Sequence, residues 1–272
     1  MKKLIYFLLL IVSWPTFAAR QFDIELIIFK RNVAPETVSE SWPEILSPIN
    51  LDRAIRLNQP TMMSKKRARL LPRSSFHLNQ QYNALKRHAG FTPLLHTAWR
   101  QGDQGRGSAP VFHLTAGQNF SNDYLPDGTS RSAMAKQAPP EPVIPDENTP
   151  IATASNPGFV EKEMAKPSAP LYELDGKLQV YVQHYLFVET ELDLKKRGKR
   201  EVILNSVVEE TDNGSNDAVQ IGHLQEVAPT VEVEEFLKSY RMDQKRRMRS
   251  GETHYLDNPL LGIIIQVRKV AS

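Results

Sequence analysis

The chain has 272 residues, of which 40% are hydrophobic and 24% are charged, with 34 Lys and Arg against 31 Asp and Glu. This composition suits one large or two small folded domains, and it excludes collagen-like and wholly disordered chains. The chain has no cysteine. Disulfides, iron–sulfur clusters, thiolate zinc sites and cysteine nucleophiles are therefore excluded.

The first residues predict a secretory signal peptide over residues 1–18. Met1-Lys2-Lys3 is basic, residues 4–12 form an unbroken apolar run, and Pro15 is then followed by small residues at Thr16, Ala18 and Ala19. The run is too short for a bilayer core, which needs about 20 residues, but it matches the apolar region of a signal peptide. We predict cleavage after Ala18 and export of the chain, with a short N-terminal anchor as the alternative.

Basic residues cluster at 65–69, 195–200 and 241–249, although the loss of Lys2 and Lys3 lowers the formal net charge from +3 to +1. Because an exported protein rarely meets nucleic acid, carboxylate-rich polymers or anionic lipids are the better partners for such clusters. No second apolar run is long enough to span a membrane after signal cleavage, and no cysteine is present for lipid attachment.

Residues 19–126 predict the N-terminal part of a single α+β domain. Gln21–Lys30 alternates apolar and polar residues before becoming apolar on both faces, which is typical of a central strand. A helix is expected between Ser75, its candidate N-cap, and Gly90, its expected stop, because apolar residues recur there with helical spacing. Thr92–Arg100 follows as a second strand.

Residues 127–170 predict a flexible, exposed insertion. Nine of the 19 prolines lie between Pro126 and Pro170, among Ala, Ser, Asn and Thr. Such a segment buries too little apolar area to offset its chain entropy.

Residues 171–272 predict the β-rich C-terminal part of the same domain. Asp175-Gly176 predicts a hairpin turn, and residues 195–200, centred on Gly198, predict a basic loop tip. A strand from Phe236 has apolar even positions and basic odd positions, although a helix is not excluded there; Leu260–Val270 is the last strand. The fold class is therefore α+β, a mostly antiparallel sheet with one or two helices and a long Pro-rich insertion.

Three segments together resemble the CsiV family: Phe22–Arg31 (FDIELIIFKR), Pro93–Gln101 (PLLHTAWRQ) and Arg246–Gly262 (RRMRSGETHYLDNPLLG). The resemblance covers both ends of the chain and the strand after Asp175-Gly176, and it omits the Pro-rich insertion. It implies a periplasmic, peptidoglycan-binding protein of Gram-negative bacteria. It also implies a role in cell shape and cell-wall assembly by a class A penicillin-binding protein, through the outer-membrane lipoprotein activator of that synthase.

Four basic residues of the strand from Phe236 are candidate ligand-binding residues: Arg241, Lys245, Arg247 and Arg249. With period two they share one side and extend over about 25 Å. Guanidinium groups bind carboxylates in a bidentate manner, and peptidoglycan stems carry carboxylates. The alternative is a solvated strand face whose charges discourage edge pairing.

His254 and Tyr255 complete the candidate site, beside Glu252 and Asp257. A histidine between two carboxylates can serve as an acid–base pair or as part of a metal site, but alternation puts these side chains on different faces, and a turn at Asp257-Asn258-Pro259 is the simpler interpretation. Aromatic candidates for stacking on sugar rings are Trp99, Tyr181, Tyr185 and Tyr255.

No hydrolase, nucleotide-binding or dinucleotide-binding motif is present, so we expect no enzyme activity, no catalytic residue, no metal and no cofactor. The favoured function is a non-catalytic peptidoglycan-binding protein. A protein–protein adaptor without glycan affinity, using the residues 195–200 tip against an acidic partner, is the alternative. A wall hydrolase with a pair of carboxylates stays open as a third hypothesis.

Export is testable by cell fractionation. We expect a periplasmic form about 18 residues shorter than the translated chain, because signal peptidase removes the apolar segment. A full-length form held in the inner membrane would instead identify the segment as an anchor.

Overall fold

The computed structural model describes residues 20–44, 46–137, 169–204 and 230–271. These residues form a mostly antiparallel β structure with few helices, which confirms the predicted α+β class. The described chain divides into two compact units. The larger consists of the described residues of Met1–Gln118, Tyr172–Leu194 and Ser239–Ser272, and the smaller of those of Asn119–Leu171 and Lys195–Lys238.

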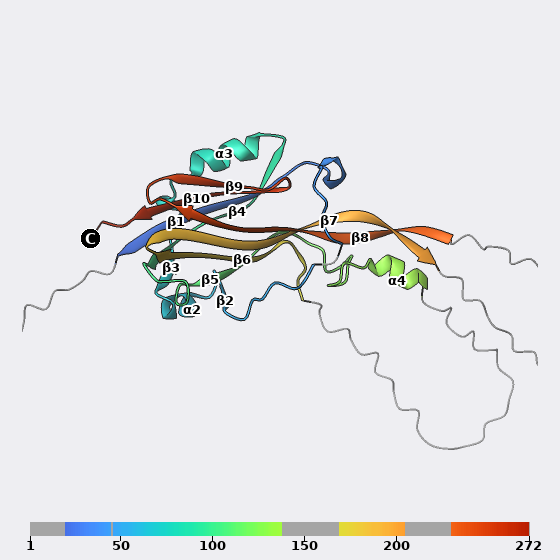
Figure 1. The fold of residues 1–272 in the computed structure, drawn as a ribbon, viewed down its shortest axis with the longest axis horizontal. Helices are drawn as coiled ribbons and strands as arrows, with labels where there is room; N and C mark the ends of the chain where they lie inside the picture. Colours follow the sequence, from blue (N-terminus) through green and yellow to red (C-terminus); the bar gives the residue numbers. More distant parts are fainter. Residues whose placement is uncertain (1–19, 45, 138–168, 205–229, 272) are drawn as a thin grey trace, which may run out of the picture. The chain divides into compact units, whose positions relative to one another are not determined.

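Two five-stranded sheets contain all the named strands of the described residues (Figure 1). The first sheet has the order β3 (Ala68–Leu70), β4 (Phe91–Gly102), β1 (Gln21–Arg31), β10 (Leu261–Lys269) and β9 (Thr253–Asp257). The second has the order β2 (Ala54–Arg56), β5 (Val111–Asn119), β6 (Tyr172–Gln183), β7 (Tyr185–Leu204) and β8 (Thr230–Met248). The helices are η1 (Pro35–Thr37), α2 (Pro60–Lys65), η2 (Arg73–Ser75), α3 (Asn79–Arg87) and α4 (Arg131–Gln137).

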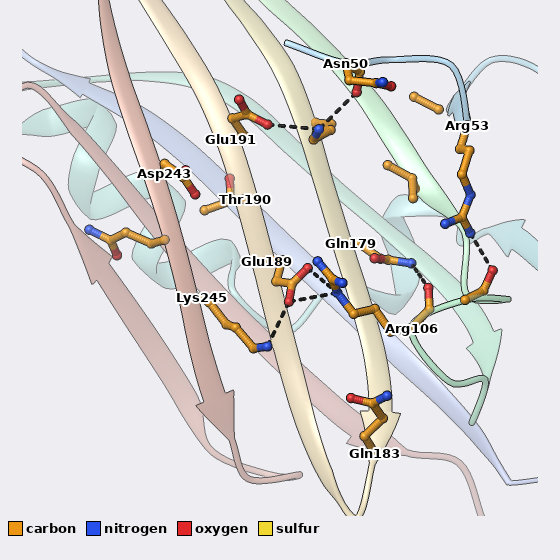
Figure 2. Close-up of a pocket in the computed structure, with 15 residues that line it drawn as sticks. Asn50, Arg53, Arg106, Gln179, Gln183, Glu189, Thr190, Glu191, Asp243 and Lys245 are labelled. Atoms are coloured by element: carbon orange, nitrogen blue, oxygen red, sulfur yellow. Dashed lines mark hydrogen bonds and ion pairs between the residues drawn. The ribbon is translucent and has the colours of Figure 1, made fainter.

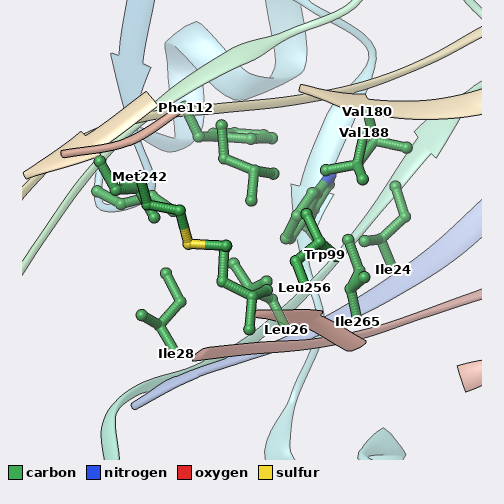
Figure 3. Close-up of a cluster of buried hydrophobic side chains, with 14 of the residues drawn as sticks. Ile24, Leu26, Ile28, Trp99, Phe112, Val180, Val188, Met242, Leu256 and Ile265 are labelled. Carbon is green, nitrogen blue, oxygen red and sulfur yellow. The ribbon is translucent and has the colours of Figure 1, made fainter. Parts of the chain in front are cut away.

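The main core of the larger unit lies between the two sheets (Figure 3). Ile24, Leu26 and Ile28 point into it from β1, because alternate residues of a strand share one face. Val188 of β7 and Met242 of β8 enter the same cluster from the second sheet. The apolar residues of both sheets are thereby removed from water together, which stabilises the pair of sheets by the hydrophobic effect.

A buried polar bridge links the two sheets inside this core. The indole nitrogen of Trp99 donates to Oε1 of Gln101 over 2.7 Å, and Nε2 of Gln101 donates to the carbonyl of Val180 over 2.8 Å. Trp99 is fully buried, so its N–H group needs such a partner.

Helix α3 covers the opposite face of the first sheet. Ile27 and Phe29 of β1 form a second apolar cluster with Leu78 and Leu85 of the helical segment. The helix presents its apolar stripe to the sheet. This packing explains why the helical spacing of apolar residues in this segment correctly predicts the helix.

Glu25 lies on this helix-covered face and is fully buried. Its carboxylate accepts hydrogen bonds from the backbone N–H groups of His77 (2.7 Å) and Leu78 (2.9 Å), and it lies 2.9 Å from Nε2 of His96 and 3.1 Å from Nη1 of Arg268. Burial raises the pKa of Glu25, but the hydrogen bonds outweigh burial and lower the pKa to about 2. An ionised carboxylate therefore ties β1 to β4, β10 and the chain before α3.

The smaller unit has its own apolar cluster of Phe120, Tyr124 and Leu237, with Leu171 packed against it. Arg197 pairs with Asp123 over 2.8 Å in this unit, and its guanidinium lies over the ring of Phe120.

Several predicted elements are confirmed. The central strand, the helix before Gly90, the strand that follows it and the last strand correspond to β1, α3, β4 and β10. The segment from Phe236 is part of a strand, β8, and is not helical. Ser75 does not cap α3, however, since a short 3-10 helix precedes it and the residue at the N-cap is Leu78.

The predicted hairpin turn at Asp175-Gly176 is wrong. Gly176 lies inside β6, opposite Leu192 of β7, and a Cβ atom there would collide with the carbonyl oxygen of Glu191. Glycine is thus required by close strand approach rather than by a turn. The actual turn is at His184, which adopts a positive φ of 55° between β6 and β7.

The predicted loop tip at residues 195–200 is also wrong, because β7 continues through this stretch to Leu204. Charged strand residues were mistaken for a loop, although Arg197 and Arg200 find carboxylate partners in Asp123 and Glu234.

Other predictions fall partly or wholly outside the described residues: the signal peptide entirely, and the insertion over residues 138–168. The first residues of the insertion contain α4.

Replacing Glu25 by Gln tests the buried carboxylate. We expect a loss of about 3 kcal/mol in the free energy of unfolding at neutral pH, because Arg268 loses its buried partner charge. Since the folded pKa lies below the ordinary value of 4.5, this contribution is present above pH 4.5 and is lost as the pH falls towards 2. Urea unfolding at several pH values measures it.

Asp103→Asn is the matched control, because Asp103 pairs with a largely exposed Arg20 and should contribute less than about 1 kcal/mol. Equal effects of the two substitutions would contradict the account of Glu25.

Candidate functional site

The predicted basic row lies on the outer face of the second sheet, along β8. Met242 and Met248 point into the core, while Arg241, Lys245 and Arg247 occupy odd positions with the opposite orientation. The predicted alternation therefore holds at these positions of β8.

An open groove of about 810 Å³ lies against this face of the larger unit (Figure 2). Its lining is polar and comes from the connection before β2, the loop before β5 and strands β6, β7 and β8. Its charged lining residues are Arg53, Arg106, Lys177, Glu189, Glu191, Asp243 and Lys245. Both signs of charge are present, so the groove is not a simple anion-binding patch.

Glu189 is the most highly connected carboxylate of the groove. Its oxygens accept hydrogen bonds from the hydroxyl of Tyr181 (2.7 Å) and from Nε of Arg106 (2.9 and 3.1 Å), and Nζ of Lys245 lies 3.1 Å away. Burial raises the pKa of Glu189, but these three donors outweigh it and hold the pKa below its ordinary value. Glu189 is consequently ionised at neutral pH.

Glu191 and Asp193 continue the row of carboxylates on β7. Lys177 of β6 lies 2.9 Å from Glu191, and Arg241 of β8 binds both oxygens of Asp193 over 2.8 Å each. Arg241 also lies 3.4 Å from Glu191, and its side chain is only 15% exposed. Arg241 therefore holds β7 and β8 together through their side chains.

The groove continues towards exposed aromatic rings near the β6–β7 turn. A cavity of about 610 Å³ is lined by Gln183, His184, Tyr185 and Phe187, and Gln183 also lines the groove. Tyr185 is 56% exposed, and the guanidinium of Arg247 lies 4.6 Å from the centre of its ring. An exposed aromatic ring of this kind can stack on the apolar face of a sugar.

Of the six predicted site residues, only Lys245 lines the groove; Arg241, Arg247, Arg249, His254 and Tyr255 do not. Nε2 of His254 accepts a hydrogen bond from the backbone N–H of Arg249 over 3.0 Å, which closes the turn between β8 and β9. The hydroxyl of Tyr255 accepts from Arg31 and donates to Asp257, and its ring stacks on Phe29. The six predicted site residues are thus not brought together at one place.

Sequence reasoning missed the groove residues supplied by other strands. Arg53, Arg106 and Lys177 lie far from β8 in the sequence, and only the sheet order brings them near it. A local signal did exist for β7: Glu189, Glu191 and Asp193 alternate with Val188 and other inward residues.

Two of the aromatic candidates are buried and unavailable for sugar stacking. Trp99 and Tyr181 have no exposed surface, whereas Tyr185 and Tyr255 are 56% and 39% exposed.

A second cavity of about 740 Å³ in the larger unit combines basic and apolar side chains beside α2 and β3. Arg67 and Arg69 come from the basic cluster at residues 65–69, and Leu70, which is 44% exposed, lies beside them.

Within the described ranges, no three His, Asp or Glu side chains gather as ligands for a metal ion. Nor does any described helix have the length and hydropathy to cross a membrane.

Fold and groove together define a β-rich protein with two sheets around one main core and an open, charged surface groove. Residues 2–270 match the family model described as "Peptidoglycan-binding protein, CsiV". The chain therefore belongs to the CsiV family, and the resemblance stated from three short segments is confirmed. Neither a curated protein nor a solved structure matches the chain.

Replacing Arg241 by Gln tests whether this largely buried cation of the row is structural, in contrast to the exposed Lys245. We expect a loss of about 2 kcal/mol in unfolding free energy, because Asp193 loses two charge-assisted hydrogen bonds. Lys245→Gln, at a largely exposed position, should change stability little. Urea unfolding compares the two, and an equal or reversed order would contradict this assignment.

Proposed function

We propose that this protein binds peptidoglycan in the periplasm, without catalysis, through the groove on the outer face of the second sheet. The observation that carries the proposal is the groove itself, in a member of a family described as peptidoglycan-binding. Peptidoglycan presents charged peptide stems beside sugar rings. The groove offers ionic and amide groups beside the exposed ring of Tyr185.

The predicted row contributes its exposed members. Lys245, Arg247 and Arg249 extend along β8 and the turn after it, where they can meet carboxylates of successive stems. Arg241 is committed to Asp193 and acts by positioning β8. His254 and Tyr255, on this proposal, serve the turn after β8 and the packing of the first sheet.

A non-catalytic role is supported by the state of the groove carboxylates. Glu189 is ionised and already accepts from three donors, so it is a poor general acid and a poor general base. Glu191 is likewise occupied by Lys177 and Arg241. A paired-carboxylate hydrolase needs one protonated acid, and the ionised Glu189 does not supply it.

We further propose that peptidoglycan binding supports cell-wall assembly, and hence cell shape, by a class A penicillin-binding protein through its outer-membrane lipoprotein activator. The support for this step is the family resemblance.

A protein–protein adaptor without glycan affinity is the second candidate function. The cavity beside α2 and β3 favours it, because Arg67 and Arg69 adjoin the exposed Leu70 and would suit an acidic partner segment with an apolar side chain.

Co-sedimentation of the mature protein with purified sacculi tests the proposal. We expect binding without release of wall fragments. Replacing Lys245, Arg247 and Arg249 together by Gln should weaken binding roughly tenfold, since each exposed charge contributes modestly. Higher salt should weaken the wild type in the same direction.

The matched control is a triple variant that removes three exposed cations around α3, by the substitutions Arg73→Gln, Lys86→Gln and Arg87→Gln. A similar loss of sacculus binding in both triple variants would show that overall charge, and not the position of the cations on β8, causes the loss. Absence of sacculus binding by the wild type would favour the adaptor, and release of fragments would favour the hydrolase.

A further inference from the structure

Ion pairs within the groove and beside it balance most of the charge. Four cations share the three carboxylates of β7: Arg106, Lys177, Arg241 and Lys245 with Glu189, Glu191 and Asp193. A polyanion would have to compete with these carboxylates for each cation, and it would leave Glu189 or Glu191 without compensation. The groove is therefore poorly suited to a ligand that carries negative charge alone.

Two charged lining residues form no ion pair among the described residues, and their signs are opposite. Arg53 donates to the carbonyl of Gly107 and has no carboxylate partner within the described ranges. The carboxylate of Asp243 on β8 is exposed and forms no ion pair or side-chain hydrogen bond within the described ranges, although its charge also acts on the neighbouring Arg241. Figure 2 shows Arg53 and Asp243 on opposite sides of the groove.

The order of the second sheet gives the separation of these two charges. Arg53 directly precedes β2, and Asp243 lies on β8, four strand spacings away. At about 4.8 Å per spacing this is about 19 Å between strands. The Arg53 side chain reaches Gly107, in the loop before β5, which shortens this separation across the strands. An extended peptide of four or five residues spans about 15 Å.

We propose that the groove recognises the peptide stem of peptidoglycan in its free, zwitterionic form, with the stem ammonium at Asp243 and a stem carboxylate at Arg53. This inference rests on the proposed function and names the element that is bound. Cross-linking converts the amine of the stem's diamino acid into an uncharged amide. A groove that uses Asp243 in this way prefers stems that are not cross-linked.

Binding of a purified disaccharide–tetrapeptide muropeptide tests the ammonium contact by calorimetry. Selective acetylation of the stem amine should weaken binding to the wild type about threefold to tenfold, because Asp243 then faces an uncharged group. Asp243→Asn should bind the free and acetylated muropeptides equally, since the coupled pair is already broken.

The carboxylate contact is tested in the same way. Amidation of the terminal carboxylate should weaken binding to the wild type, but it should have no further effect on Arg53→Gln. Asp103→Asn and Arg73→Gln, exposed positions outside the groove lining, serve as controls and should keep both preferences.

Three outcomes would overturn the inference. In the first, Asp243→Asn still discriminates between free and acetylated muropeptides, or Arg53→Gln between free and amidated ones, as the wild type does. In the second, the wild type binds the free and modified muropeptides equally. In the third, glycan strands stripped of stems by an amidase bind as tightly as the muropeptide. In each case continued sacculus binding would leave the proposed function standing, whereas loss of sacculus binding by the wild type would remove both.

Discussion

The row of carboxylates on β7 is the constraint on which the candidate site depends. Alternation places Glu189, Glu191 and Asp193 on one face of the strand, only about 7 Å from one to the next. Like charges at this spacing repel each other, so cations are required on both sides of the strand. Arg106 and Lys177 supply them on one side, and Arg241 and Lys245 on the other. The charged groups of this face that are not used in these ion pairs then decide which ligand it can bind.

In the first sheet, a carboxylate is stabilised in a different way. Glu25 is covered on the α3 side of its sheet and is satisfied by four donors, so its charge serves stability. The β7 carboxylates instead border an open groove, where their ion pairs remain accessible to a ligand. Burial thus separates a structural carboxylate from those that shape a surface, although both kinds alternate with apolar residues in the sequence.

The helices and strands that depend on local periodicity could be predicted from the sequence. β1, α3, β4 and β10 follow from the spacing of apolar residues, and the family resemblance came from three short segments. Prediction from the sequence was wrong where a residue type is compatible with two different local structures. Gly176 serves close strand approach instead of a turn, and the charges at residues 195–200 belong to a strand instead of a loop. The groove was beyond reach, because Arg53 and Asp243 become neighbours of one groove only through the sheet order.

Mapping muropeptide binding by amide chemical shifts tests the central claim most directly. If the outer face of the second sheet is the binding surface, shifts should concentrate in β7 around Glu189, in β8 around Asp243 and near Arg53. Residues of α3 and β9, including Tyr255, should be unaffected. Shifts concentrated on α3 and β9, with the groove residues unchanged, would contradict the account.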